Sequence, residues 1–104
     1  MANLNKKQFE FTRKIAFLIL YANSLGYELT FGDAYRSAEI NYGHPNSLHR
    51  KRLAVDFNLF KNGKYLKKTE DHRILGEYWE SIGGSWGGRF QDGNHYSLEH
   101  NGMR

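Results

Sequence analysis

The feature that most constrains the fold is an alternating stretch in the middle of the chain. Across residues 53–60 every second residue, beginning with Leu53, is apolar, which is the pattern of a strand with one buried face. The stretch is followed by Asn62-Gly63, and Asn-Gly between two apolar runs is the strongest short-range signal for a β-hairpin. We therefore expect an antiparallel sheet, in which Asp56 points away from the aliphatic face.

Two helices are expected, one on each side of this hairpin. Residues 3–25 carry an apolar stripe at helical period, and Asn3 or Asn5 can cap its start. Residues 70–82 carry a second stripe, for which Thr69 is the expected cap. The stripes consist of Phe11, Ile15, Leu18, Ala22 and Leu25 in the first helix and of Ile74, Leu75, Tyr78, Trp79 and Ile82 in the second.

The remaining sequence patterns indicate the fold class. Residues 27–34 alternate as a strand does, and a last strand is expected at about residues 94–100, with His95 on one face. The order helix, strands, helix, strands predicts an α+β fold, a small single domain 1–104 with an antiparallel sheet and two main helices. The apolar run at residues 15–20 is too short to span a membrane and lacks a convincing cleavage site after it, so no signal peptide is expected.

Composition restricts the chemistry and the partners. The 104 residues include no cysteine, so disulfides and thiolate ligands are excluded and any metal must be held by histidine and carboxylate. The formal net charge of +4 favours an anionic partner, such as nucleic acid, an anionic lipid surface or an acidic cell-wall polymer. Charge alone does not distinguish these partners.

Two distant segments supply residues that suit a catalytic metal. His49, Asp56 and His95 provide two imidazoles and one carboxylate, which would leave a fourth position open for water, and Asp92 is a spare carboxylate. In a straight chain His49 and Asp56 would be roughly 24 Å apart. They can share an ion only if residues 50–52 bend back.

The chain has three other histidines, one of which is an alternative ligand. His44 is the main rival ligand, because it precedes His49 by five residues in the same expected loop. His72, at the start of the second helix, and His100, on the opposite face of the last strand, are expected to be structural.

Three short motifs carry a family resemblance: Ser47-x-His49, Ala54-x-Asp56 and Asp92-x-x-His95. Together they resemble the zinc peptidases of the D-alanyl-D-alanine carboxypeptidase and L-alanyl-D-glutamate endopeptidase family, most of all its short phage endolysins. The family pattern is Ser-x-His-x-x-Gly-x-Ala-x-Asp, followed downstream by acidic-x-x-His. The chain departs from it at Arg52, which stands at the glycine position and puts the backbone path between the first two ligands in question.

The resemblance implies the fold of D-Ala-D-Ala peptidases and hedgehog domains, with zinc bound by His49, Asp56 and His95. It also implies that Asp92 is a catalytic residue, the base that takes a proton from water and passes it to the leaving amine. The alternative for Asp92 is an ordinary turn residue before a glycine, where aspartate is common for local hydrogen-bonding reasons.

Three residues are expected to contact substrate, namely Arg36, Ser47 and Trp86. By resemblance, Arg36 is also catalytic, because its guanidinium suits a carboxylate or the oxyanion of a tetrahedral intermediate. The alternatives are an ion pair between Arg36 and Glu39, a turn-capping role for Ser47, and a core position for Trp86, which lies in the glycine-rich run at residues 83–88.

The function implied is zinc-dependent hydrolysis of an amide bond in the stem peptides of bacterial peptidoglycan. L-Ala–D-Glu cleavage by a phage lysis enzyme is the first expectation, and D-Ala–D-Ala carboxypeptidase activity is the second. We expect a monomer without stable membrane insertion or nucleic-acid partner, located in the host cytoplasm until lysis and then acting on the wall. A zinc-binding module without catalysis and a basic nucleic-acid-binding domain are the alternatives from other classes.

Overall fold

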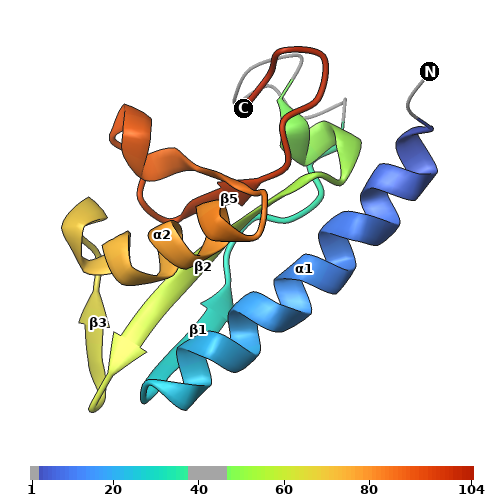
Figure 1. Ribbon diagram of the computed structural model, residues 1–104. Coiled ribbons are helices and arrows are strands. Elements are labelled where there is room, and N and C mark those ends of the chain that lie inside the picture. Colours follow the sequence, from blue (N-terminus) through green and yellow to red (C-terminus); the bar gives the residue numbers. More distant parts are fainter. Residues whose placement is uncertain (1–2, 38–46) are drawn as a thin grey trace.

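The computed structural model describes residues 3–37 and 47–104 and shows two helices on one face of an antiparallel sheet (Figure 1). The core lies between these layers, where the Trp79 ring meets Phe11 and Tyr96 edge-on, with ring centroids 5.9 and 6.3 Å apart. This arrangement confirms the α+β class. The elements are α1 (Leu4–Ser24), β1 (Tyr27–Phe31), η1 (Leu48–Lys51), β2 (Ala54–Lys61), β3 (Lys64–Leu66), η2 (Thr69–His72), α2 (Arg73–Ser81), β4 (Ser85–Trp86), η3 (Gly87–Phe90) and β5 (His95–Ser97), where η marks a 3-10 helix.

The first helix forms as expected. The Asn3 side chain caps α1 by accepting hydrogen bonds from the backbone N–H groups of Asn5 and Lys6. Gly26, at φ +86°, follows the end of the helix in the left-handed conformation that glycine adopts without strain. Within the described residues, no helix is long and apolar enough to cross a membrane. The buried side of α1 consists of Phe11, Ile15, Leu18 and Ala22.

The strand β2 is the centre of the sheet, as its alternation predicts. The strand order is β1-β2-β5-β4, with β3 also pairing with β2, and the pairings are antiparallel. The predicted hairpin is confirmed: Lys61 pairs with Lys64, and Asn62 and Gly63 between them both have positive φ. Phe57 and Leu59 are buried, whereas Asp56 is half-buried on the other side of the strand.

The second helix begins differently from the prediction. Its first turn is the 3-10 helix η2, and the backbone N–H of Lys68 is capped by the Asp71 carboxylate at 3.1 Å. Thr69 is therefore not the cap; its hydroxyl accepts a hydrogen bond from the backbone N–H of Gly93 instead. Ile74, expected on the buried side, is exposed.

Two strands are shorter than expected. β1 ends at Phe31, whose side chain is exposed, and Leu25 before it is also at the surface. β5 spans only His95–Ser97, and His100 forms an isolated bridge with Met103 rather than continuing the strand.

A buried polar pair joins the second helix to the sheet. The Nδ1 atom of His72 and the hydroxyl of Tyr96 are hydrogen-bonded at 2.8 Å. Burial lowers the pKa of His72 to about 4 and raises the pKa of Tyr96. The imidazole is therefore neutral at neutral pH, and these contacts are those of a structural histidine.

Acidification should destabilise the protein through His72. Its folded pKa lies below the ordinary value of 6.5, so the unfolded chain takes up the extra proton first as the pH falls. The contribution of this imidazole to the free energy of unfolding is complete above pH 6.5 and declines toward pH 4, by up to about 3 kcal/mol. Denaturant unfolding of the metal-free protein across this range measures the loss. An imidazole of His72 that titrates near its ordinary pKa by NMR in the folded protein would contradict it.

Candidate metal centre

Two of the expected ligands face each other across paired strands. Asp56 on β2 is the register partner of His95 on β5, and residues opposite each other in an antiparallel pair project to the same side of the sheet. The backbone around Asp56 is held on its other edge too, because its N–H donates to the Asp33 carbonyl and its carbonyl accepts from the Gly32 N–H, both at 2.7 Å.

The third ligand reaches this place because the chain bends as the sequence requires. His49 lies in η1, whose first turn is capped by the Ser47 hydroxyl accepting from the His49 N–H at 3.2 Å. The turn closes where the Leu53 N–H donates to the Leu48 carbonyl. The predicted bend across residues 50–52 is thus present.

Arg52, the residue at which the chain departs from the family pattern, adopts a backbone conformation typical of glycine. It ends η1 at φ 57° and ψ 36°, a left-handed conformation that glycine adopts freely and that costs other residues about 1–2 kcal/mol. The backbone path is therefore the one that a glycine would favour. The Arg52 guanidinium lies over the Tyr35 ring, 4.0 Å from its centroid, and this cation–π contact offsets part of the cost.

The three side chains converge on one point. One nitrogen of each imidazole and one oxygen of Asp56 all lie within 4.8 Å of one another. Asp56 Oδ1 is 3.4 Å from His49 Nε2 and 3.4 Å from His95 Nδ1. Both imidazoles are buried.

The charges of the group are coupled. Burial alone would raise the pKa of the Asp56 carboxyl, but the two adjacent imidazoles outweigh it and lower this pKa to about 2. Burial likewise opposes the charged form of His49, yet Asp56 and the Ala34 carbonyl raise the pKa of His49 above its ordinary value. Asp56 is therefore an anion at neutral pH.

These residues fit a zinc ion. Two ligands about 2.0–2.1 Å from a tetrahedral zinc are about 3.4 Å apart, which is the separation of Asp56 Oδ1 from each imidazole nitrogen. This oxygen is buried and, among the described residues, has no hydrogen-bond partner of good geometry. An unsatisfied buried carboxylate oxygen is costly unless a cation balances it. The Nδ1 atom of His49 lies 3.0 Å from the Ala34 carbonyl, a contact that leaves Nε2 as the ligand atom.

Asp92 lies beside the group rather than in it. The residue as a whole is exposed, in a turn where its carbonyl accepts from the His95 N–H and its own N–H donates to the Gly87 carbonyl. Burial of the carboxyl by its surroundings raises the pKa of Asp92, although the residue as a whole is exposed, and the Asp56 charge raises it further.

A tightly packed scaffold holds this turn. The Trp86 N–H donates to the Gly93 carbonyl at 2.7 Å, and the Gly93 N–H donates to Thr69 at 3.2 Å. A Cβ on Gly87 would come within 2.2 Å of the Asp92 carbonyl oxygen, so only glycine fits there. Trp86 is fully buried, and the structure therefore gives it the core position rather than the predicted contact with substrate.

The other expected substrate residues lie near the first ligand. Arg36 is buried; its Nη2 pairs with Asp33 at 3.1 Å, and its backbone N–H donates to the His49 carbonyl. Ser47 has the turn-capping contact described above. The rival ligand His44 and the alternative ion-pair partner Glu39 lie outside the described residues.

Several supporting residues had no recognisable signal in the sequence. The Ala34 carbonyl orients His49, and the Thr69 hydroxyl holds the turn before His95, through contacts between segments 15 and 24 residues apart. The Trp86 N–H holds the same turn through a carbonyl seven residues further along the chain. Glycines in the run at residues 83–88 were the one available hint of close packing.

Comparison with known proteins agrees with this geometry. A family model described as D-alanyl-D-alanine carboxypeptidase matches residues 41–98, more than half of the chain. The matched segment contains His49, Asp56, Asp92 and His95. No curated protein matches the chain. The chain therefore belongs to the D-alanyl-D-alanine carboxypeptidase family of peptidases.

Proposed function

We propose that this protein is a zinc-dependent peptidase that hydrolyses an amide bond in peptidoglycan stem peptides. The observation that carries the proposal is the convergence of His49, Asp56 and His95, with an unsatisfied buried carboxylate oxygen, inside the segment that matches the family. His49 Nε2, Asp56 Oδ1 and His95 Nδ1 would hold the ion. Zinc bound there supplies a Lewis acid for the scissile carbonyl and lowers the pKa of a bound water.

Asp92 is the proposed general base. Asp92 is an exposed residue near the ligand group and is not needed as a ligand. Partial burial of its carboxyl raises its pKa, which makes it a better proton acceptor than an ordinary aspartate. It would take the proton of the attacking water and deliver it to the departing amine.

Arg36 and Ser47 are proposed to position the substrate. Arg36 is buried next to the His49 turn and carries a fixed positive charge, which suits an anionic group of the stem peptide or the oxyanion of the intermediate. Contact between Ser47 and substrate stays a prediction, since the structure shows its oxygen in the turn.

The proposals for the bond that is cleaved and for the biological setting rest on the family resemblance. We propose the L-Ala–D-Glu bond first and the terminal D-Ala–D-Ala bond as the alternative, in a phage endolysin that accumulates in the host cytoplasm before lysis. We further propose that residues 1–104 form one peptidase domain that acts as a monomer, because one chain supplies all three ligand side chains.

Digestion of purified peptidoglycan tests the proposal. We expect new termini that appear with added zinc and disappear with a chelator, identified by mass spectrometry of the released muropeptides. New L-Ala carboxyl and D-Glu amino termini would support the first choice, whereas release of single D-Ala residues would support the alternative. Equal products with and without chelator, or none with zinc, would contradict zinc-dependent peptidase activity.

A further inference from the structure

The helix α1 has a second apolar face, directed away from the core. Phe9, Phe17 and Leu20 are 59%, 56% and 66% exposed. At about 100° per residue they fall within a sector of about 80°, roughly opposite the buried residue Leu18. We call Phe9, Phe17 and Leu20 the outer face of α1. A helix that only covered a core would carry polar residues on this side.

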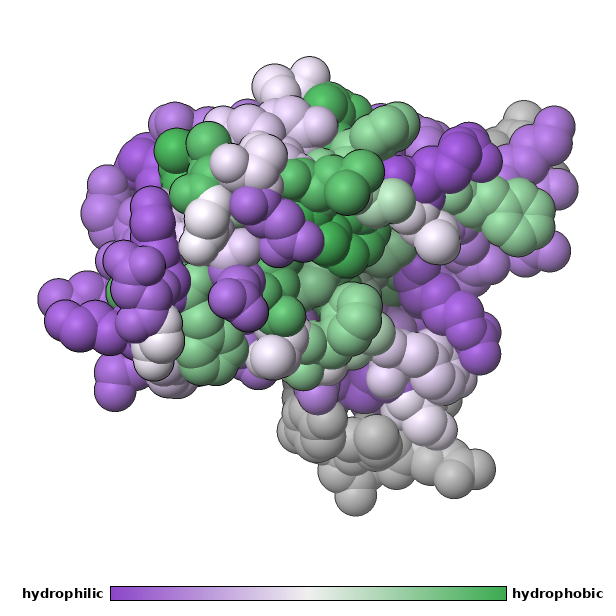
Figure 2. Space-filling view, turned by 90° about the horizontal axis from the view of Figure 1, so that it is seen from below, coloured by the Kyte–Doolittle hydropathy of each residue, from purple (hydrophilic) through white to green (hydrophobic). Residues whose placement is uncertain are grey.

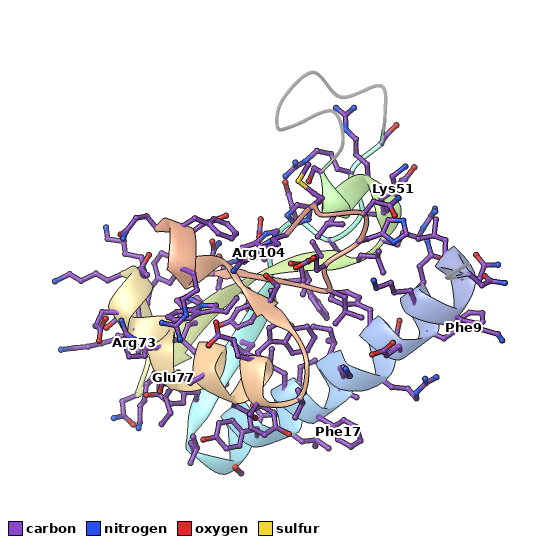
Figure 3. All side chains as sticks on the ribbon, turned by 45° about the horizontal axis from the view of Figure 1, so that its top comes forward. Phe9, Phe17, Lys51, Arg73, Glu77 and Arg104 are labelled. Atoms are coloured by element: carbon purple, nitrogen blue, oxygen red, sulfur yellow. The ribbon has the colours of Figure 1, made fainter. Side chains whose placement is uncertain are left out.

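The views of the molecule agree with this placement. Phe9 and Phe17 both project from the outer side of α1, away from the sheet (Figure 3). Seen from below, apolar side chains form a band that is bordered by hydrophilic ones (Figure 2). The outer face therefore offers large apolar side chains that the described residues, 3–37 and 47–104, leave exposed.

Positive charge surrounds the outer face. Arg13 lies between Phe9 and Phe17 on the helix surface, and Lys6 lies one turn before Phe9. The one acidic residue of α1, Glu10, is paired with Lys14 at 2.8 Å.

A second group of cations lies beside the start of the helix. The Gln8 side chain donates to the Lys51 carbonyl at 2.8 Å, which brings the basic run at residues 50–52 next to α1. Positive charge is thus concentrated around the amino-terminal half of the helix.

We propose that the outer face of α1 binds the surface of an anionic lipid bilayer. Phe9, Phe17 and Leu20 enter the boundary between headgroups and acyl chains, while Lys6 and Arg13 pair with lipid phosphates. The helix lies on the bilayer and does not cross it.

Two other occupants fit the observations less well. A soluble polyanion, such as a wall polymer or a nucleic acid, would use the charges but would leave the apolar side chains in water. A second copy, packed antiparallel about the middle of the face, would bring Arg13 close to Arg13 of its partner, and such like charges repel. A lipid surface satisfies both the apolar and the cationic side chains.

Vesicle sedimentation tests the proposal. The zinc-loaded protein should bind vesicles of phosphatidylglycerol and phosphatidylcholine at least roughly tenfold more strongly than pure phosphatidylcholine vesicles. Replacing Phe9, Phe17 and Leu20 together with glutamine should lower this binding by at least roughly tenfold. The exposed apolar residues Tyr65 and Ile74, replaced with glutamine in a control variant, should leave it unchanged.

A fluorescent reporter and a size measurement complete the test. In Phe17→Trp, the new indole should show a blue shift with anionic vesicles, whereas Trp79 and Trp86 are already buried. The proposal would be overturned if the triple and control variants bound anionic vesicles equally well. It would also be overturned if the wild type showed no preference for anionic vesicles. Self-association of the wild type that the triple variant abolishes would also overturn it, because a second copy would then be the occupant. Cleavage of soluble stem peptides should be equal in all variants, so this test is independent of the peptidase proposal.

Discussion

Replacing Asp56 with asparagine should remove zinc binding and peptidase activity together. The carboxylate lies 3.4 Å from both imidazoles and supplies the only negative charge of the ligand group. The neutral amide of asparagine has nearly the same shape but lacks this charge and is a poor zinc ligand. We expect zinc affinity to fall by about 100-fold or more, since even changes outside the ligand set cost about 10–100-fold. Competition with a chromophoric chelator measures the affinity.

The controls separate loss of the metal from loss of the fold. Asp71→Asn removes a carboxylate charge elsewhere while keeping an oxygen that can cap the Lys68 N–H, so it should bind zinc as the wild type does. Circular dichroism should show the same secondary structure in both variants. Chelator-sensitive cleavage of peptidoglycan by Asp56→Asn at the wild-type rate would rule out this ligand set.

The sequence predicted Asp56 better than any other part of the site. Period-two alternation in a strand assigns each residue to a face, so the side of the sheet followed from local pattern alone. It could not show that His95 would be the register partner of Asp56, because strand pairing depends on contacts between distant segments. The family resemblance supplied that link, and the structure supplies the geometry.

The backbone path between His49 and Asp56 could not be predicted from the sequence for a different reason. Arginine is an unusual residue for a left-handed position, so the sequence put the bend between the first two ligands in question. The conformation persists because the turn hydrogen bonds and the Tyr35 contact hold it. The contacts of the folded protein therefore outweigh the preference of arginine for other backbone conformations.

The cap of the second helix and the position of Trp86 were also decided by packing rather than by local sequence. Thr69 is a good cap by type, but Asp71 caps the Lys68 N–H and leaves the Thr69 hydroxyl for Gly93, 24 residues further along the chain. Trp86 could have lain in a cleft or in the core, and only the packed glycines around it decide for the core. Both outcomes depend on the three-dimensional neighbours of these residues.

Replacing Asp92 with asparagine should reduce turnover while leaving zinc binding almost unchanged. The turn that places His95 is held by backbone atoms of residue 92 and by Trp86 and Thr69, none of which the substitution alters. The amide can no longer accept a proton from water. Loss of a general base typically costs about 100–10,000-fold in rate, and we expect the rate of stem-peptide cleavage to fall within that range.

The pair of asparagine variants distinguishes the roles of the two carboxylates. Zinc affinity and cleavage rate, measured on the same preparations, should both fall in Asp56→Asn, whereas only the rate should fall in Asp92→Asn. A parallel loss of zinc affinity in Asp92→Asn would make Asp92 a structural part of the metal site. Unchanged cleavage in Asp92→Asn would exclude it as the base. A wild type that binds zinc but cleaves no peptidoglycan would favour a zinc-binding module, since the ligand group needs only His49, Asp56 and His95 to hold an ion.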